Sequence, residues 1–128
     1  MTAIYGTEAN DILYGTMNAD ISIFGKGGND SIYGRDGADI VDAGAGNDTV
    51  YGGDDDDTIL GRSGNDLLKG EDGDDVIWGE SGNDELHGGN GMDSLLGGDG
   101  DDKLLGVASR NAIEIDELTG GNGRDIFW

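Results

Sequence analysis

The chain has 128 residues, enough for one domain, with 27 Gly, no Pro, no Cys and a formal net charge of −21 at pH 7. The missing cysteines exclude disulfides and thiolate metal sites, and the negative charge disfavours nucleic acid and anionic membranes as partners. Such a composition also suits a disordered chain, unless acidic and apolar residues recur in register.

The N-terminal segment MTAIYGTEANDILYG has neither the basic nor the apolar region of a cleaved signal peptide. No apolar run in the sequence approaches the roughly 20 residues of a transmembrane helix. We therefore expect a chain without a cleaved N-terminal signal and without membrane insertion.

Nine-residue units follow one another over residues 6–105. The unit at 15–24 is one residue too long, so that either Ser22 points inward or a bulge places Ile23 in the core, and we favour the bulge. From residue 25 the register is regular, and the last five units read GRSGNDLLK, GEDGDDVIW, GESGNDELH, GGNGMDSLL and GGDGDDKLL. These units fit the pattern G-G-x-G-x-D-x-U-x, in which U is a large aliphatic residue. The strict period argues against disorder.

Residues 106–119 break the pattern and predict an inserted loop or a short extra element on one side of the stack. Residues 120–128, GGNGRDIFW, restore it as a twelfth repeat with Asp125 at the sixth place. The sequence thus divides into eleven repeats over 1–105, the insertion, and a closing repeat.

Each unit consists of a six-residue turn and a three-residue strand whose middle residue faces inward. Gly at the first and fourth places permits positive φ or close chain approach. So short a strand must reverse after every turn, and two units then form one 18-residue coil. Asn at the fifth place of alternate units supports this period. We predict an all-β protein, a parallel β-roll (β-solenoid) of about six coils. Its core residues would be Leu13, Ile32, Val41, Val50, Ile59, Leu68, Ile77, Leu86, Leu95, Leu104 and Phe127.

The sixth place of every repeat holds an aspartate: Asp11, Asp20, Asp30, Asp39, Asp48, Asp57, Asp66, Asp75, Asp84, Asp93, Asp102 and Asp125. Coils stacked at roughly 4.8 Å would align each carboxylate with the one two repeats later, giving one column with Asp48, Asp66 and Asp84 and another with Asp57, Asp75 and Asp93. Such columns oppose folding unless cations neutralise them.

Ca²⁺ suits this arrangement, because it accepts six to eight oxygen ligands in flexible geometry. Mg²⁺ demands a strict octahedron, and Zn²⁺ or copper would need His or Cys, of which His87 is the only example. Pairing across two repeats allows up to about ten Ca²⁺ ions, which would nearly balance the chain's charge.

On these motifs the chain resembles the repeats-in-toxin (RTX) family of calcium-binding β-roll modules, over residues 6–105 and 120–128. The resemblance implies Ca²⁺ bound between adjacent turns by the sixth-place carboxylates and by turn carbonyl groups. Those turn positions are Gly44, Gly46, Gly53, Asp55, Arg62, Gly64, Glu71, Gly73, Glu80, Gly82, Gly89, Gly91, Gly98 and Gly100. The side chains of Glu71 and Glu80 are expected in solvent.

The resemblance further implies a module that is disordered without Ca²⁺ and folds on binding it, after type I secretion to the exterior. Family members usually continue into a capping segment, so we expect further domains in the parent protein, and self-association through the solenoid ends stays open.

The sequence also bears on two other classes of function. Catalysis is disfavoured, because the chain has one His, no Cys and isolated Ser residues. Adhesion or ice and surface binding is the alternative, favoured by the Asn row and weakened by the lack of an adjacent Thr row.

Overall fold

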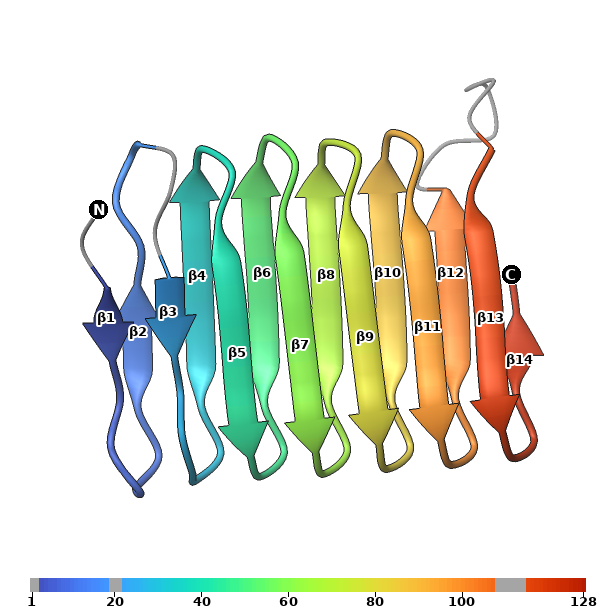
Figure 1. Cartoon of the computed structure of the whole chain (residues 1–128), viewed down its shortest axis with the longest axis horizontal. Helices are drawn as coiled ribbons and strands as arrows, with labels where there is room; N and C mark the ends of the chain where they lie inside the picture. The colour runs from blue at the N-terminus through green and yellow to red at the C-terminus, as the bar shows by residue number, and fades with distance from the viewer. Residues whose placement is uncertain (1–2, 19–21, 108–114) are drawn as a thin grey trace.

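The computed structural model describes residues 3–18, 22–107 and 115–128. Its strands form two parallel sheets of seven strands each, and successive strands alternate between them (Figure 1). The odd sheet contains β1 (Ile4–Tyr5), β3 (Ser22–Phe24), β5 (Ile40–Ala45), β7 (Thr58–Ser63), β9 (Val76–Ser81), β11 (Ser94–Asp99) and β13 (Glu117–Asn122). The even sheet contains β2 (Ile12–Tyr14), β4 (Ser31–Asp36), β6 (Thr49–Asp54), β8 (Leu67–Asp72), β10 (Glu85–Asn90), β12 (Lys103–Val107) and β14 (Ile126–Phe127).

The pairing confirms the predicted all-β parallel roll with an 18-residue coil. Ile59 of β7 pairs with Ile77 of β9, and Val50 of β6 pairs with Leu68 of β8, each 18 residues apart. Seven strands in each sheet are separated by six steps, which agrees with about six coils. The strands themselves are longer than predicted, because the first three turn residues also join the ladder. Most strands between β4 and β13 therefore have six residues.

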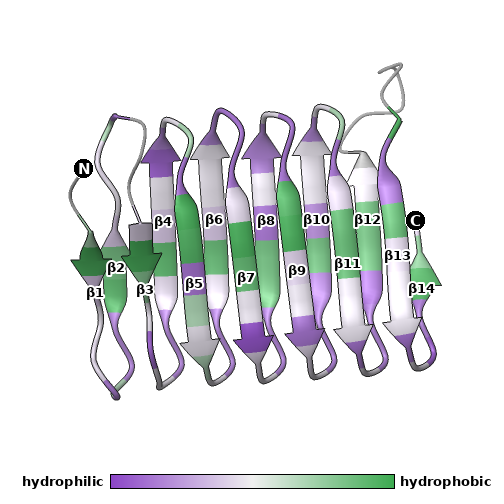
Figure 2. Cartoon of the chain, in the orientation of Figure 1, coloured by the Kyte–Doolittle hydropathy of each residue, from purple (hydrophilic) through white to green (hydrophobic). Residues whose placement is uncertain are grey.

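A single column of aliphatic side chains fills the space between the sheets. Its fully buried members are Ile23, Ile32, Val41, Val50, Ile59, Leu68, Ile77, Leu86, Leu95 and Leu104, together with Ala43. Figure 2 shows the corresponding hydrophobic band across the middle of the strands. Ile23 is buried, which confirms its predicted place in the core, whereas the unit in which the bulge was expected contains residues 19–21, which lie outside the described residues.

The column is incomplete at its two ends. Leu13 is only partly buried, and Phe127 is 51 % exposed, so the prediction of Phe127 as a core residue was wrong. Its strand, β14, is the last of the even sheet, and no described strand covers it on the outer side. A core position is buried here only when a coil packs on both sides of it.

Glycine has different roles at different places of the repeat. At the first place, a Cβ on Gly52 would collide with the Asp57 carboxylate and meet the Gly70 carbonyl oxygen of the next coil. At the fourth place, Gly73 has a φ of +140°. Close approach therefore favours glycine at the first place, although Ala43 is accommodated there, and positive φ favours glycine at the fourth, where Asp55 has a φ of 78°. The second place also has positive φ, even where it is not Gly, as in Glu71 with φ 86°.

Candidate metal-binding site

The sixth-place aspartates lie directly before the strands, inside the turns. Nine of them are only 1–3 % exposed: Asp30, Asp39, Asp48, Asp57, Asp66, Asp75, Asp84, Asp93 and Asp102. Asp11 and Asp125, in the outer coils, are half-buried. Asp20 lies outside the described residues. A repeating row of buried carboxylates is costly in a protein interior unless partners compensate the lost hydration.

In most of these carboxylates, Oδ1 accepts a hydrogen bond from the backbone of the preceding coil. Oδ1 of Asp66 accepts a hydrogen bond from the backbone N–H of Asp48 over 2.8 Å, and Oδ1 of Asp84 accepts from Asp66 over 2.9 Å. In the other column, Asp57 N–H donates to Asp75 over 2.8 Å, and Asp75 N–H donates to Asp93 over 3.0 Å. These contacts align the aspartates in the two predicted columns.

The second oxygen has a different environment. In Asp30, Asp48, Asp57, Asp66, Asp75, Asp84 and Asp102, Oδ2 is buried and has no hydrogen-bond partner in the described part of the chain. In all of these except Asp48, whose repeat begins with Ala43, Oδ2 faces the first-place glycine of its own repeat, where an added Cβ would meet it, as at Gly70 with Asp75. An oxygen that is buried and unpaired loses its hydration without a replacement, and a cation would supply one.

Burial also changes the acidity of these groups. Desolvation raises the pKa of Asp57 to about 8, against a partial lowering by its backbone hydrogen bond. The same cause raises the pKa of Asp66 and Asp75 to about 7 and that of Asp84 to about 6. The columns therefore disfavour the charged carboxylate in the absence of a counter-ion.

Backbone carbonyl groups of the turns provide further oxygen atoms between the coils. All of the second- and fourth-place residues from Gly44 to Gly100 have positive φ, including Asp55, Arg62, Glu71 and Glu80. The carbonyl oxygen of Gly64 points at the Cα of Gly82 in the next coil, since a Cβ there would collide with it. The Arg62 carbonyl oxygen accepts a hydrogen bond from the Ser81 hydroxyl over 3.0 Å.

Within the described residues, no three His, Cys, Asp or Glu side chains converge on one point. A metal site here would therefore combine carboxylate oxygens with turn carbonyl oxygens. Such a donor set fits Ca²⁺, which prefers oxygen ligands of both kinds, and the unpaired Oδ2 atoms show that donor capacity remains.

The sequence reading missed one aspartate of these columns. The backbone N–H of Asp93 donates to Oδ1 of Asp116 over 3.0 Å, and the N–H of Asp102 donates to Asp125 over 3.1 Å. Asp116, and not Asp125, thus follows Asp93, because residues 117–122 form β13 and add a strand to the odd sheet. The sequence DELTG at 116–120 repeats the D-x-U-x-G spacing and could have revealed it.

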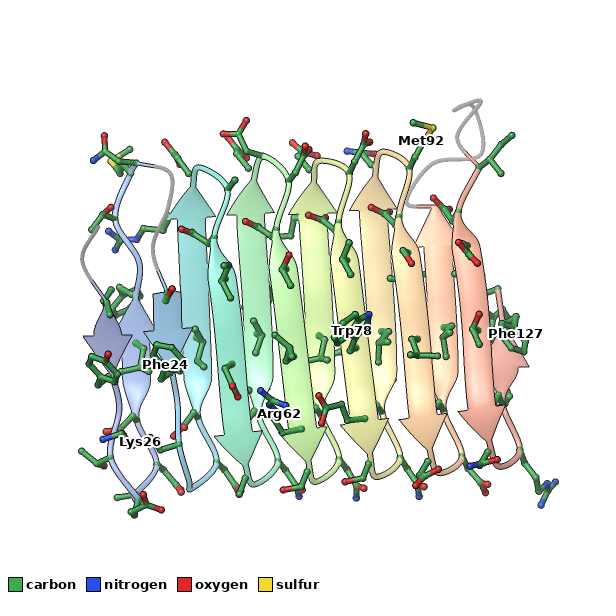
Figure 3. The ribbon with its side chains drawn as sticks, viewed as in Figure 1. Phe24, Lys26, Arg62, Trp78, Met92 and Phe127 are labelled. Carbon is green, nitrogen blue, oxygen red and sulfur yellow. The ribbon has the colours of Figure 1, made fainter. Side chains whose placement is uncertain are left out.

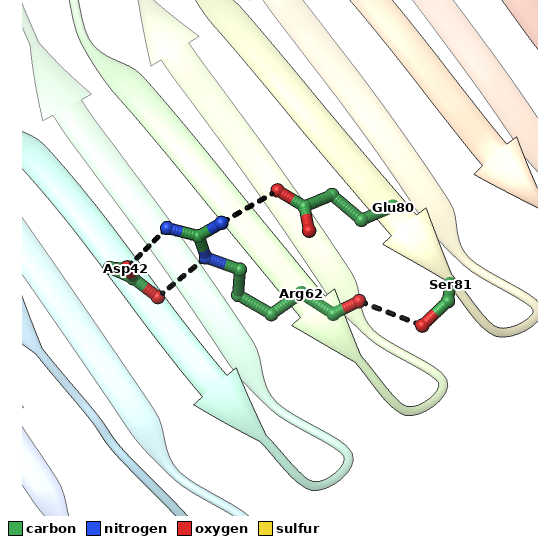
Figure 4. A network of polar contacts seen from close by, with 4 residues as sticks. All are labelled: Asp42, Arg62, Glu80 and Ser81. Atoms are coloured by element: carbon green, nitrogen blue, oxygen red, sulfur yellow. Dashed lines mark hydrogen bonds and ion pairs between the residues drawn. The ribbon is translucent and has the colours of Figure 1, made fainter.

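The remaining charged side chains lie outside these columns. Arg62 spans three coils of the odd sheet, pairing with Asp42 over 2.8 Å and with Glu80 over 3.1 Å (Figure 4). The side chains of Glu71 and Asp54 are exposed. Asn47 Oδ1 accepts a hydrogen bond from the backbone N–H of Asn65, so the Asn row stabilises the stack of turns.

The sequence profile of the RTX calcium-binding nonapeptide repeat (4 copies) matches residues 3–21, 22–50, 51–86, 87–109 and 114–128. The chain belongs to this family. No curated protein matches the chain. RTX repeats are a structural calcium-binding module, so Ca²⁺ is the ligand that the family implies, and they are typical of secreted proteins. In the part of this RTX chain that the structure describes, no helix could cross a membrane.

Proposed function

We propose that this RTX chain is a calcium-dependent folding module that binds several Ca²⁺ ions between successive coils. The observation that carries the proposal is the set of buried, unpaired Oδ2 atoms in the two aspartate columns, for example in Asp57, Asp66 and Asp75. Each would hold a cation together with carbonyl oxygens of the second and fourth places. When bound, Ca²⁺ supplies positive charge to a chain whose net charge is −21.

Metal binding and folding are coupled in this proposal. The aliphatic core is narrow, because each inner coil contributes only two core side chains, one from each sheet. Each of these coils also adds two buried carboxylates beside them. Without a cation, the desolvation of those carboxylates opposes the stabilisation from the core. Because the columns exist only in the stacked coils, the free energy of metal binding becomes free energy of folding.

The proposed setting follows from this coupling. A chain that stays unfolded at low cytosolic Ca²⁺ could pass a type I secretion channel, and roughly millimolar Ca²⁺ outside the cell would then fold it.

A titration of the metal-free protein with Ca²⁺, followed by far-UV circular dichroism, tests the proposal. We expect a cooperative change from coil to β-structure, since each coil packs only on its neighbours. Mg²⁺ at equal concentration is the control and should leave the spectrum unchanged. A β-spectrum already present in chelator would contradict the folding switch, and an unchanged spectrum in Ca²⁺ would contradict the binding.

A further inference from the structure

The two ends of the stack expose apolar side chains at corresponding places of the repeat. Ile12 and Tyr14 are 66 % and 52 % exposed at one end, and Ile126 and Trp128 are 48 % and 74 % exposed at the other. The first end is formed by β1 and β2, and the second by β13 and β14 (Figure 1). Phe127 lies on this second end (Figure 3).

These residues match in register. In the even sheet, Leu104 pairs with Phe127 at one end and Leu13 pairs with Ile32 at the other, so Leu13 and Phe127 occupy the same place in the coil. A second copy stacked beyond β14 at the normal step would set its Ile12, Leu13 and Tyr14 on Ile126, Phe127 and Trp128. In the odd sheet, its Ile4 would cover Leu118, because Leu118 continues the column of Leu95 and Ile4 that of Ile23.

The hydrogen bonds between coils have one direction, which makes the two ends complementary. Each sixth-place N–H donates to Oδ1 in the following coil, from Asp11 to Asp30 at the start and from Asp102 to Asp125 at the end. The last coil therefore presents the N–H of Asp125 outward, and the first coil presents Oδ1 of Asp11. Strand β14 likewise offers an edge for the parallel partner β2 of a second copy.

The charges at this junction also correspond. Arg124 is exposed on the turn before β14, at the fifth place of its repeat. Asn10 has the same place at the opposite end, with the exposed Glu8 and the half-buried Asp11 beside it. Arg124 would therefore face carboxylates of the second copy, whereas the net charge of −21 on each copy opposes association until cations neutralise it.

We propose that folded copies of this chain stack head to tail, with the β13–β14 end of one copy on the β1–β2 end of the next, and so continue the roll. The contact repeats the packing that already joins the coils within one chain. Because the two surfaces differ, every added copy exposes a new end, and the assembly grows without closing. Ile40 holds the same seventh place as Ile12 but lies in β5, between β3 and β7, and takes no part.

Sedimentation velocity in Ca²⁺, over a roughly hundredfold range of protein concentration, tests the stacking. Far-UV circular dichroism of the same samples reports whether the roll is folded. The end variants are Ile12→Asp and Phe127→Asp, which place a carboxylate at exposed positions of the two ends. Ile40→Asp is the matched control, because Ile40 is apolar and 51 % exposed on the side of the roll.

We expect the wild type and Ile40→Asp to form a growing series of oligomers. Each end variant should need at least about tenfold more protein to reach the same degree of association. A mixture of Ile12→Asp and Phe127→Asp should form dimers, because each variant retains the end that the other lacks.

A folded wild type that stays monomeric would overturn the stacking, as would a closed dimer or association that Ile40→Asp abolishes. A chain that is unfolded in Ca²⁺ would refute the proposed function instead, and one folded in chelator would refute only the switch and leave the stacking measurable.

Discussion

The backbone N–H of Asp93 donates to Oδ1 of Asp116 over 3.0 Å, although the two residues lie 23 positions apart in the sequence. Asp75 makes the same contact with Asp93 over 3.0 Å at the regular separation of 18 positions. The longer connection between Asp93 and Asp116 therefore leaves the contact between coils unchanged. Gly106 corresponds to the first-place glycine of a regular repeat, because a Cβ there would collide with the Asp116 carboxylate.

This equivalence predicts that Asp116 contributes to Ca²⁺ binding under the proposed function. Asp116→Asn should remove one negative ligand and lower the number or the affinity of bound Ca²⁺, measured by isothermal titration calorimetry. The adjacent Glu117→Gln is the control, since Glu117 is exposed and should bind Ca²⁺ as the wild type does. Equal binding by Asp116→Asn and the wild type would exclude Asp116 as a ligand.

Asp57 and Asp54 belong to the same repeat, and substituting each in turn distinguishes the loss of a metal ligand from a change in net charge alone. Asp57 is 1 % exposed with an unpaired Oδ2, whereas Asp54 is exposed. Asp57→Asn should raise the Ca²⁺ concentration at the folding midpoint about tenfold, since a charged ligand is lost. Asp54→Asn, which changes the net charge equally, should leave the midpoint within about twofold. Similar shifts in both variants would show that only the total charge matters.

The raised pKa values predict how pH acts on the metal-free chain. The pKa of Asp57 rises from 3.8 to about 8 and that of Asp66 to about 7, so the folded state binds these protons more tightly than the unfolded state. Their contribution to stability is complete below about pH 4 and is lost as the pH rises through 7 and 8. In metal-free buffer, lowering the pH from about 8 to about 5 should therefore increase β-structure in circular dichroism. Asp57→Asn should reduce this dependence, and a loss of β-structure at the lower pH would contradict it.

Glu71 has a φ of 86°, in the region that glycine adopts most easily. Glu71→Gly should raise the free energy of unfolding in saturating Ca²⁺ by about 1 kcal/mol, because the strain of a side chain at positive φ is removed. The reciprocal change Gly73→Ala should lower it by about 1–3 kcal/mol, since φ is +140° and the new Cβ would meet the Asp55 carbonyl group. Urea denaturation measures both, and a destabilised Glu71→Gly would show that the side chain matters more than the strain.

The nonapeptide period by itself determined the parallel roll, the 18-residue coil and the two aspartate columns. Each coil packs only on its neighbours, so a local pattern such as D-x-U-x-G specifies every coil in the same way. The burial of Ile23 could be predicted for the same reason.

The column of Asp125 was predicted wrongly, although the D-x-U-x-G spacing at 116–120 marks the additional strand β13 in the sequence. Two features depended on the tertiary structure. Strand length did, because Gly53 and Glu71 pair across coils at positions that the repeat assigns to the turn. The exposure of Phe127 did, because burial of an eighth-place residue requires a coil on both sides, and the sequence of one repeat does not record its neighbours.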